Sequence, residues 1–252
     1  MPEYSLHLLA LKPGYTIPTF LSTIHSNSIT PLVQAQVLRW IILPQKQSTV
    51  PLLAHNVRWD LLLVVERTVV LPTQATSQVT ASWTAEISLH PNDVKDYATK
   101  NAKLLEASKR SPPPTSGDSE MTTELRDWLS HRPSAQQTHP ISMLNLLAFN
   151  PGRREQYRQY GQAFGQAITP KLGNSRKFMG NVIGGQGREE GWEEVLLVHN
   201  HSLGHFAAMS GDPEFLAINK KFRLGTLKDT AILCVMDVGG DGKPLGQSTS
   251  RL

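Results

Sequence analysis

The stretch Leu144-Asn145-Leu146-Leu147-Ala148-Phe149-Asn150-Pro151-Gly152 decides the fold, because the chain contains it twice. Near the N-terminus, Leu6-His7-Leu8-Leu9-Ala10-Leu11-Lys12-Pro13-Gly14 is identical to it at six of nine positions. A second pair of apolar runs, at 59–65 and 192–198, follows in the same order. Recurrence on this scale is typical of a domain-sized module used twice. We therefore predict two related modules, with His7 and Asn145 at equivalent positions.

Hydrophobic periodicity predicts the order strand, helix, strand, strand, helix, strand for the second module, which is the ferredoxin-like arrangement. The first module repeats this order with weaker helices, because Pro72 disrupts the second one, and adds an amphipathic helix over 92–105. The predicted class is α+β, with both modules forming one barrel within the chain. Its divisions are a first module (1–106), a linker with a possible short helix (107–139), a second module (140–238) and a flexible tail (239–252).

Composition narrows the class of protein. The 252 residues are 39% hydrophobic, which is sufficient for a core, and the formal charge is +4. The basic residues are scattered, so we expect no nucleic-acid partner. No apolar run is long enough to cross a bilayer. A lone cysteine, Cys234, and no basic leader region at Met1-Pro2-Glu3 predict a soluble cytoplasmic protein.

His7 is the most informative polar residue, because it lies at the centre of an apolar strand. A near-neutral imidazole there is either a general base or a structural residue that hydrogen-bonds across the core. Asn145 either orients a substrate oxygen or braces its strand. Arg39 either binds an anionic ligand or forms a buried ion pair with Asp60. We take His7, Arg39 and Asn145 as the candidate catalytic group, converging on the barrel interior.

Aromatic residues are the candidates for substrate contact. Trp40, Trp59 and Trp83 lie on predicted strands, while Tyr157 and Tyr160 lie on one helix face, where core packing is the alternative. Asp60 is added as the neighbour of Trp59. The segment Gly184-Gly185-Gln186-Gly187 is predicted to be a hairpin turn. It is not a phosphate-binding loop, because a strand rather than a helix follows it and no Lys-Ser/Thr comes after.

Three closely spaced histidines, His199, His201 and His205, form a separate candidate group. Imidazoles at such spacing can bind a divalent metal or haem iron. No Glu or Cys completes a recognised site, and His205 can equally cap or flank its helix. We therefore expect neither metal nor cofactor, and keep a haem or metal protein as a third possibility.

The second module resembles the dimeric α/β-barrel superfamily over roughly residues 140–238, and within it a branch of unknown function with an Asn in the first strand. The motifs that carry this resemblance are Met143-Leu144-Asn145-Leu146-Leu147, Asn150-Pro151-Gly152, Tyr157-x-x-Tyr160, Trp192-Glu193-Glu194-Val195, His205-Phe206-Ala207-Ala208-Met209 and Asp212-Pro213-Glu214-Phe215. The resemblance implies two sheets around a ligand cavity. It implies a fold but no particular reaction.

The expected function is a small-molecule enzyme that performs cofactor-independent proton transfer on an apolar or aromatic carbonyl compound. Cyclisation, isomerisation, decarboxylation and oxygenation all fall within this expectation. The alternative from another class is a binding or carrier module that holds a similar ligand without converting it. Because one chain supplies both sheets, the barrel should form in a monomer, although a homodimer is possible.

Overall fold

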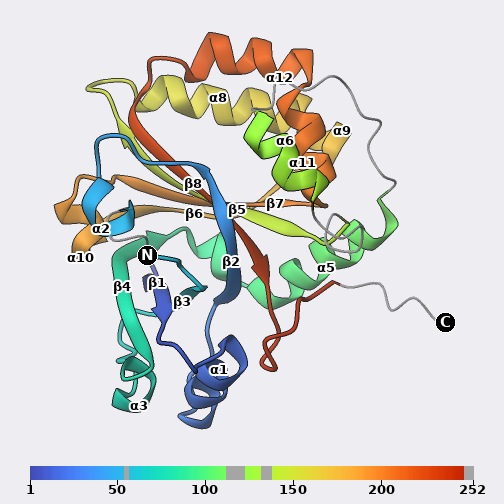
Figure 1. The fold of residues 1–252 in the computed structure, drawn as a ribbon. Coiled ribbons are helices and arrows are strands. Elements are labelled where there is room, and N and C mark those ends of the chain that lie inside the picture. Colours follow the sequence, from blue (N-terminus) through green and yellow to red (C-terminus); the bar gives the residue numbers. More distant parts are fainter. Residues whose placement is uncertain (54–56, 112–122, 132–137, 247–252) are drawn as a thin grey trace.

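A computed structural model describes residues 1–53, 57–111, 123–131 and 138–246 of the chain (Figure 1). Eight antiparallel strands close into one barrel in the order β1-β3-β2-β8-β5-β7-β6-β4. Within each half of this ring, the strands follow the ferredoxin-like order, β4-β1-β3-β2 in the first and β8-β5-β7-β6 in the second. The predicted α+β class and the pair of ferredoxin-like modules are confirmed.

The first module has short helices around its four strands. Its elements are β1 (Glu3–Leu11), α1 (Ile17–Ser26), β2 (Val33–Ile42), α2 (Thr49–Leu53), β3 (Leu61–Glu66), α3 (Thr73–Thr76) and β4 (Val79–Leu89). Thr16 caps α1, and Pro18 in the first turn suits a helix start. After β4 come α4 (Pro91–Val94), α5 (Tyr97–Arg110) and α6 (Thr123–Ser130).

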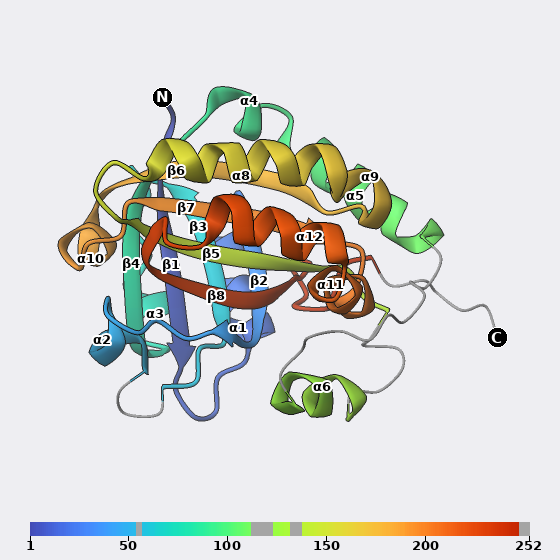
Figure 2. The same ribbon diagram turned by 90° about the horizontal axis from the view of Figure 1, so that it is seen from above.

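The second module has longer helices on its outer face. Its elements are β5 (Ile141–Phe149), α8 (Arg154–Ala167), α9 (Thr169–Leu172), β6 (Ser175–Gly184), α10 (Gly185–Glu189), β7 (Glu194–Asn200), α11 (Leu203–Ser210), α12 (Pro213–Ile218), the π-helix η2 (Asn219–Arg223) and β8 (Leu227–Asp237). Ser202 and Asp212 accept hydrogen bonds from the first turns of α11 and α12, as their positions in the sequence predict. Helices α8 and α12 cover this sheet, whereas α1 lies against the first module (Figures 1 and 2).

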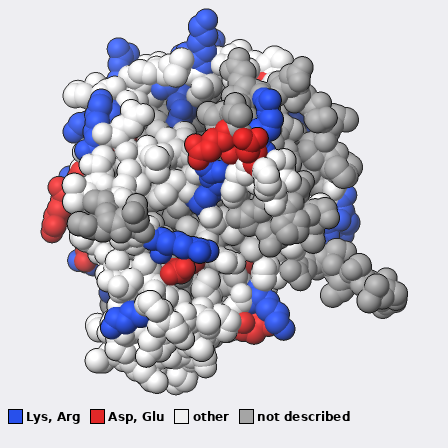
Figure 3. Space-filling view, viewed as in Figure 1, with Lys and Arg blue, Asp and Glu red and all other residues white. Residues whose placement is uncertain are grey.

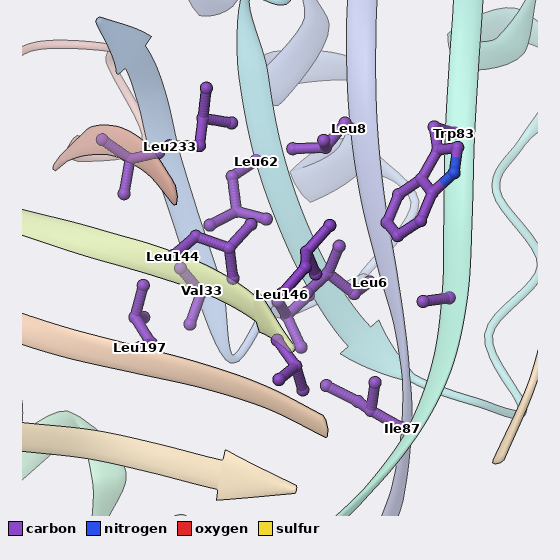
Figure 4. Packing of buried hydrophobic residues seen from close by; sticks show 14 of the residues in the cluster. Leu6, Leu8, Val33, Leu62, Trp83, Ile87, Leu144, Leu146, Leu197 and Leu233 are labelled. Carbon is purple, nitrogen blue, oxygen red and sulfur yellow. The ribbon is translucent and has the colours of Figure 1, made fainter. Parts of the chain in front are cut away.

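The barrel interior is filled by apolar side chains from all eight strands (Figure 4). Leu6 and Leu8 of β1 meet Leu144 and Leu146 of β5 there, and all four are at most 1% exposed. An eight-stranded barrel is just wide enough for side chains to fill. The centre of the barrel is therefore a packed core, and any ligand must be sought towards its two ends.

The two ends of the barrel differ in what closes them. Helices α2 and α10 lie at one end, where β1, β2, β5 and β6 finish, and α5 lies at the other, where these strands begin (Figures 1 and 2). We call these the aromatic end, after Trp40, Trp59, Trp83 and Trp192, and the polar end, after Lys177, His199 and Asp237.

Several predicted elements differ from the structure. The helix expected over 92–105 is split into α4 and α5 by Asp96, whose left-handed backbone (φ 56°) starts a new helix axis. The glycine-rich turn contains the short helix α10, beginning at Gly185 (φ 69°). Part of the loop expected over 51–56 belongs to α2.

The linker and the tail were predicted to lack packed structure. The linker helix is present as α6, while the proline run at 112–114 lies outside the described residues. Residues 239–246 of the predicted flexible tail fold back in a turn in which the Leu245 amide donates to the Asp237 carbonyl at 2.8 Å, and residues 247–252 lie outside the described residues. Among the described residues, no helix is long and apolar enough to span a membrane.

Candidate functional site

His7 faces away from the barrel interior. Its neighbours Leu6 and Leu8 point inwards, and successive side chains of a strand alternate between faces. His7 therefore shares the outer face with Leu9, which packs beneath α1. Burial lowers the pKa of His7 to about 4, and its Nε2 atom has no hydrogen-bond partner in the described structure. The prediction that His7 faces the interior is wrong.

Arg39 also points outwards and binds a different acid from the one expected. Its guanidinium contacts the Glu124 carboxylate at 2.9 Å and lies 5.0 Å from the ring centroid of Trp128, so it holds α6 against β2. Asp60 instead accepts a hydrogen bond from the Leu11 amide at 2.8 Å. The alternative of an Arg39–Asp60 ion pair is therefore wrong.

Asn145 lies on the outer face of the second sheet, because Leu144 and Leu146 point inwards. Its amide donates to the Met143 carbonyl at 3.0 Å, a contact that braces its own strand. His7, Arg39 and Asn145 thus occupy three separate outer positions, and their predicted convergence does not occur. A catalytic role for any one of them stays a prediction.

Tyr157 and Tyr160 pack between α8 and the outer face of the second sheet. The Tyr157 ring centroid lies 5.4 Å from those of Phe149 and Tyr160. Burial raises the pKa of both phenols. These contacts are those of a satellite core, which was the alternative interpretation of this helix face.

Trp40, Trp59, Trp83 and Trp192 all lie towards the aromatic end, where Trp40 packs against the core cluster that contains the other three. The indole N–H of Trp59 donates to the Leu52 carbonyl at 3.1 Å, and that of Trp83 to the Glu190 carboxylate at 2.8 Å. The Trp192 indole donates to the Ser48 hydroxyl at 2.7 Å. These three indole N–H groups therefore have partners within the chain, as buried tryptophans usually do.

The loop after β2 is fixed over the aromatic end by one carboxylate. Asp229 accepts hydrogen bonds from the backbone amides of Gln45, Lys46 and Gln47, the shortest at 2.7 Å. Burial opposes the charge, yet these amides lower the pKa of Asp229 below its usual value. These hydrogen bonds thereby fix the position of the loop at this end of the barrel.

The polar end contains a buried ion pair inside the barrel. Lys177 Nζ lies 2.6 Å from Asp237 Oδ2, and the two side chains are 1% and 7% exposed. A bulge between Arg176 and Phe178 breaks the register of β6, so that Lys177 is buried along with Phe178. Bulges commonly redirect a side chain in this way. Asn101 of α5 donates to the same Asp237 oxygen at 2.8 Å.

Lys177 keeps Asp237 ionised despite its burial. Desolvation alone would raise the pKa of Asp237, but the Lys177 ammonium and the Asn101 amide lower it below its usual value. Nearby, burial and then the Asp237 charge raise the pKa of Tyr97 well above its usual value. At neutral pH this end therefore combines an ammonium, a carboxylate and a neutral phenol.

His199 lies in the same end, fully buried on the inward face of β7. Burial, and then the Lys177 charge, lower the pKa of His199 to about 3, so the imidazole is neutral. Its Nε2 atom lies 2.8 Å from Ser108 Oγ, and the Leu104 carbonyl also favours a proton on the ring. We assign the proton to Nε2, which leaves the Nδ1 lone pair free.

Four buried polar atoms of this cluster have no hydrogen-bond partner among the described residues: Tyr97 Oη, Asn101 Oδ1, His199 Nδ1 and Asp237 Oδ1. Leaving such a group unpaired costs about 1 to 3 kcal/mol, so native structures rarely keep several together. A small polar molecule beneath α5 would satisfy them. This concentration of unsatisfied donors and acceptors makes the polar end the candidate site.

The three histidines predicted as a group do gather at this end. The His201 ring centroid lies 5.7 Å from that of His199 and 5.3 Å from that of His205. Their nitrogens face serine hydroxyls, because Ser108 bridges His199 and His201 while Ser111 contacts His205. Within the described ranges, no three His, Cys, Asp or Glu side chains are arranged to hold a metal.

Sequence reasoning missed Lys177, Asp237 and Tyr97 as site residues. Asp237 carried a usable signal, since it ends the apolar run Ile232 to Met236 in phase with the inward residues Leu233 and Val235. Lys177 carried none, because strict alternation with Phe178 would put it outside.

Comparison with known proteins gives weak structural similarities. No family model and no curated protein matches the sequence. Two structures of the RPA0582 protein, one methylated and the other described as a protein of unknown function from Rhodopseudomonas palustris, are 25% and 24% identical. They cover 48% and 47% of this chain, and 94% and 95% of that chain, with TM-scores of 0.37.

A "putative monooxygenase" from Lactobacillus acidophilus NCFM is 6% identical, and the match covers 94% of this chain and 93% of that chain with a TM-score of 0.46. Similarities with TM-scores this low carry no argument about activity. The closed ring of two ferredoxin-like sheets is the architecture that the resemblance to dimeric α/β barrels implied.

Proposed function

We propose that this chain is an enzyme that transfers a proton from carbon on a small carbonyl compound bound at the polar end, using its own side chains and no cofactor. The observation that supports this is the set of four buried, unpaired polar atoms around an ion pair. Binding alone does not require a free titratable group, whereas proton transfer does. His199 provides such a group in its Nδ1 lone pair.

The side chains suggest a division of roles. His199 Nδ1 takes the proton, and the electrons of the broken C–H bond form an enolate. Lys177 has three donor hydrogens, of which Asp237 binds one, so its positive charge is suited to stabilise the enolate oxygen. Tyr97 and Asn101 on α5 orient the substrate. Proton removal of this kind is shared by isomerisation, cyclisation and cofactor-free oxygenation of activated carbonyl compounds, whereas decarboxylation reaches the same enolate by loss of CO2.

The surroundings favour a ligand with an apolar or aromatic part. Tyr97 belongs to the same packed cluster as Leu89 and Phe178, so the polar groups adjoin an apolar wall. For a ligand to reach these buried groups, α5 must move. Only Tyr97 and Ser108 of its fourteen residues are buried, so this helix is held by few contacts. Sparse burial of this kind is typical of elements that open locally.

Hydrogen–deuterium exchange at carbon tests the proposal whichever of these reactions the chain catalyses. The full chain would be incubated in D2O with a panel of small aryl ketones and 2-oxo acids, and loss of the α-proton signal followed by NMR. The variant His199→Gln should lower the rate for any active compound by ~10²-fold or more. His7→Gln, which changes the other predicted base, should leave it unaltered. Loss in His7→Gln with an unchanged rate in His199→Gln would overturn the proposal.

A ligand-binding module is the second candidate, and the low pKa of His199 favours it. An imidazole with a pKa of about 3 is a weak base, since the best general bases have pKa values near the working pH. Compounds that bind saturably, detected by shifts of the Tyr97 and Asn101 amide signals, without exchanging their α-protons would support this function instead.

A further inference from the structure

We infer that Ser108 connects His199 to His201 as a path along which a proton leaves the buried site. The inference rests on the proposed function, because it concerns where the proton goes after His199 has accepted it. His199 is fully buried, whereas His201 is partly exposed. A proton taken up by His199 therefore needs a route to solvent before the next turnover.

The geometry supplies that route in two short steps. Ser108 Oγ lies 2.8 Å from His199 Nε2 and 2.8 Å from His201 Nδ1. Both distances are those of good hydrogen bonds between heteroatoms. The serine comes from α5, whereas the two histidines flank the end of β7, so the bridge exists only while α5 covers the barrel.

Each atom in the bridge can pass on a proton as it receives one. When His199 Nδ1 gains a proton, its Nε2–H is released to Ser108 Oγ, and the serine hydroxyl gives its own proton to His201 Nδ1. His201 then carries two ring protons and loses that on Nε2 to water. No electrons are exchanged, and His199 is left neutral with its proton on Nδ1. The starting tautomer is restored when Nδ1 releases its proton to the bound molecule or to water that enters the site, while Nε2 takes a proton back along the bridge.

Charges around the path favour outward movement. Lys177 adjoins His199 and opposes a second positive charge there, while Asp237 partly offsets it. Burial lowers the pKa of His201, and its ring also contacts that of His205. A proton is thus disfavoured on the buried ring beside the ammonium and is better tolerated on the ring nearer water.

The competing explanation is that Ser108 only fastens α5. Its hydroxyl lies 2.9 Å from the Leu104 carbonyl, a common contact of serine within a helix. A fastening role predicts that removal of the hydroxyl loosens α5 and speeds the exchange of everything beneath it. A conducting role predicts the opposite for the His199 ring proton, which loses its route.

Exchange of the ring N–H protons with water distinguishes the two roles in the full chain without a substrate. In 15N-labelled protein, saturation transfer from water would be measured for the His199 and His201 ring protons. Ser108→Ala should slow exchange at His199 by ~100-fold, the scale of a lost proton-transfer partner. Ser108→Thr, which keeps a hydroxyl, should restore it. Ser111→Ala is the matched control, because it removes the serine that contacts His205 instead.

Unchanged or faster exchange at His199 in Ser108→Ala overturns the inference, and faster exchange of the α5 backbone amides would then identify a fastening role. The result is separable from the proposed function. If the α-proton assay depends on His199 while Ser108→Ala leaves ring exchange unaltered, only the path fails. If ring exchange depends on Ser108 but no carbonyl compound loses its α-proton, the path stands and the proposed function fails.

Discussion

The two ends of the barrel bury comparable polar groups with opposite results. At the aromatic end, the indoles of Trp59, Trp83 and Trp192 each donate to a partner in the chain. At the polar end, Tyr97, His199 and other groups are buried with unpaired atoms around two opposite charges. A satisfied network rigidifies a core, whereas a partly satisfied one costs free energy unless something else completes it. Under the proposed function, the unpaired groups of the polar end are completed by a ligand, whereas the indoles of the aromatic end are completed by the chain itself.

The largest effect is expected at the polar end when half of the ion pair is removed. Lys177→Met leaves Asp237 buried without its partner, which typically costs about 3 to 5 kcal/mol in the free energy of unfolding. Urea denaturation would measure the loss.

The double variant Lys177→Met/Asp237→Leu should recover most of that stability, because a well-packed apolar pair replaces a buried ion pair at little cost. It should also abolish any exchange of substrate α-protons. If the double variant is no more stable than the single one, the ion pair is a structural element and the contrast between the ends is lost.

Acid should lower the free energy of unfolding through protonation of His199 in the unfolded chain. Its pKa falls from 6.5 in the unfolded chain to about 3 in the fold, so the unfolded state binds one more proton between these values. Stability then rises with pH, and is lost as pH falls, by up to about 1.4 kcal/mol per unit. Between pH 6.5 and pH 5 this amounts to roughly 2 kcal/mol.

His199→Gln should lower the slope of unfolding free energy against pH by the contribution of one proton, from pH 6.5 down to about pH 3. His7→Gln should do so only down to about pH 4, where the His7 pKa lies. Denaturation curves at several pH values would separate the two, and equal slopes in His199→Gln and the parent chain would contradict the burial of a neutral imidazole at this end.

A smaller loss is expected at the aromatic end. Trp192→Phe removes the indole that donates to Ser48 and some packing volume, with an expected cost of about 1 to 2 kcal/mol. Ligand binding and α-proton exchange should keep their parent values. A change in either, in a variant that remains folded, would mean that the aromatic end contributes to function and that the division between the ends is wrong.

No effect at all is expected on dilution. Because one chain closes all eight strands, unfolding midpoints should be independent of concentration and light scattering should give the mass of a monomer. A midpoint that falls on dilution would show that a second chain stabilises one of the ends.

Sequence predicted the fold well because the strands are long apolar runs that occur twice. The equivalence of β1 with β5, and of β3 with β7, could be identified from residues alone. The helix caps Ser202 and Asp212 could be identified in the same way. Such signals are local, and each is carried by residues close together in the chain.

The site could not be predicted in the same way, because it depends on which face of a strand points inwards. In Leu6-His7-Leu8-Leu9, both faces are apolar, so the pattern does not say whether His7 or its neighbours enter the core. Lys177 turns inwards at a bulge, and α5 crosses the end because Asp96 adopts a left-handed backbone. These are single-residue departures from regular geometry, and periodicity averages over them.

The ring of strands has one further consequence. Each strand of the first module lies four places from its counterpart, so the modules are related by half a turn about the barrel axis. In a pair of identical chains, every residue at an end would face its own copy, and two Lys177 ammoniums would confront each other. Here Asp237 has Leu89 as its counterpart across the axis. Joining the halves covalently therefore permits an asymmetric end, which under the proposed function would hold one unsymmetrical molecule in one orientation. On the face shown in Figure 3, acidic and basic side chains are scattered among uncharged ones.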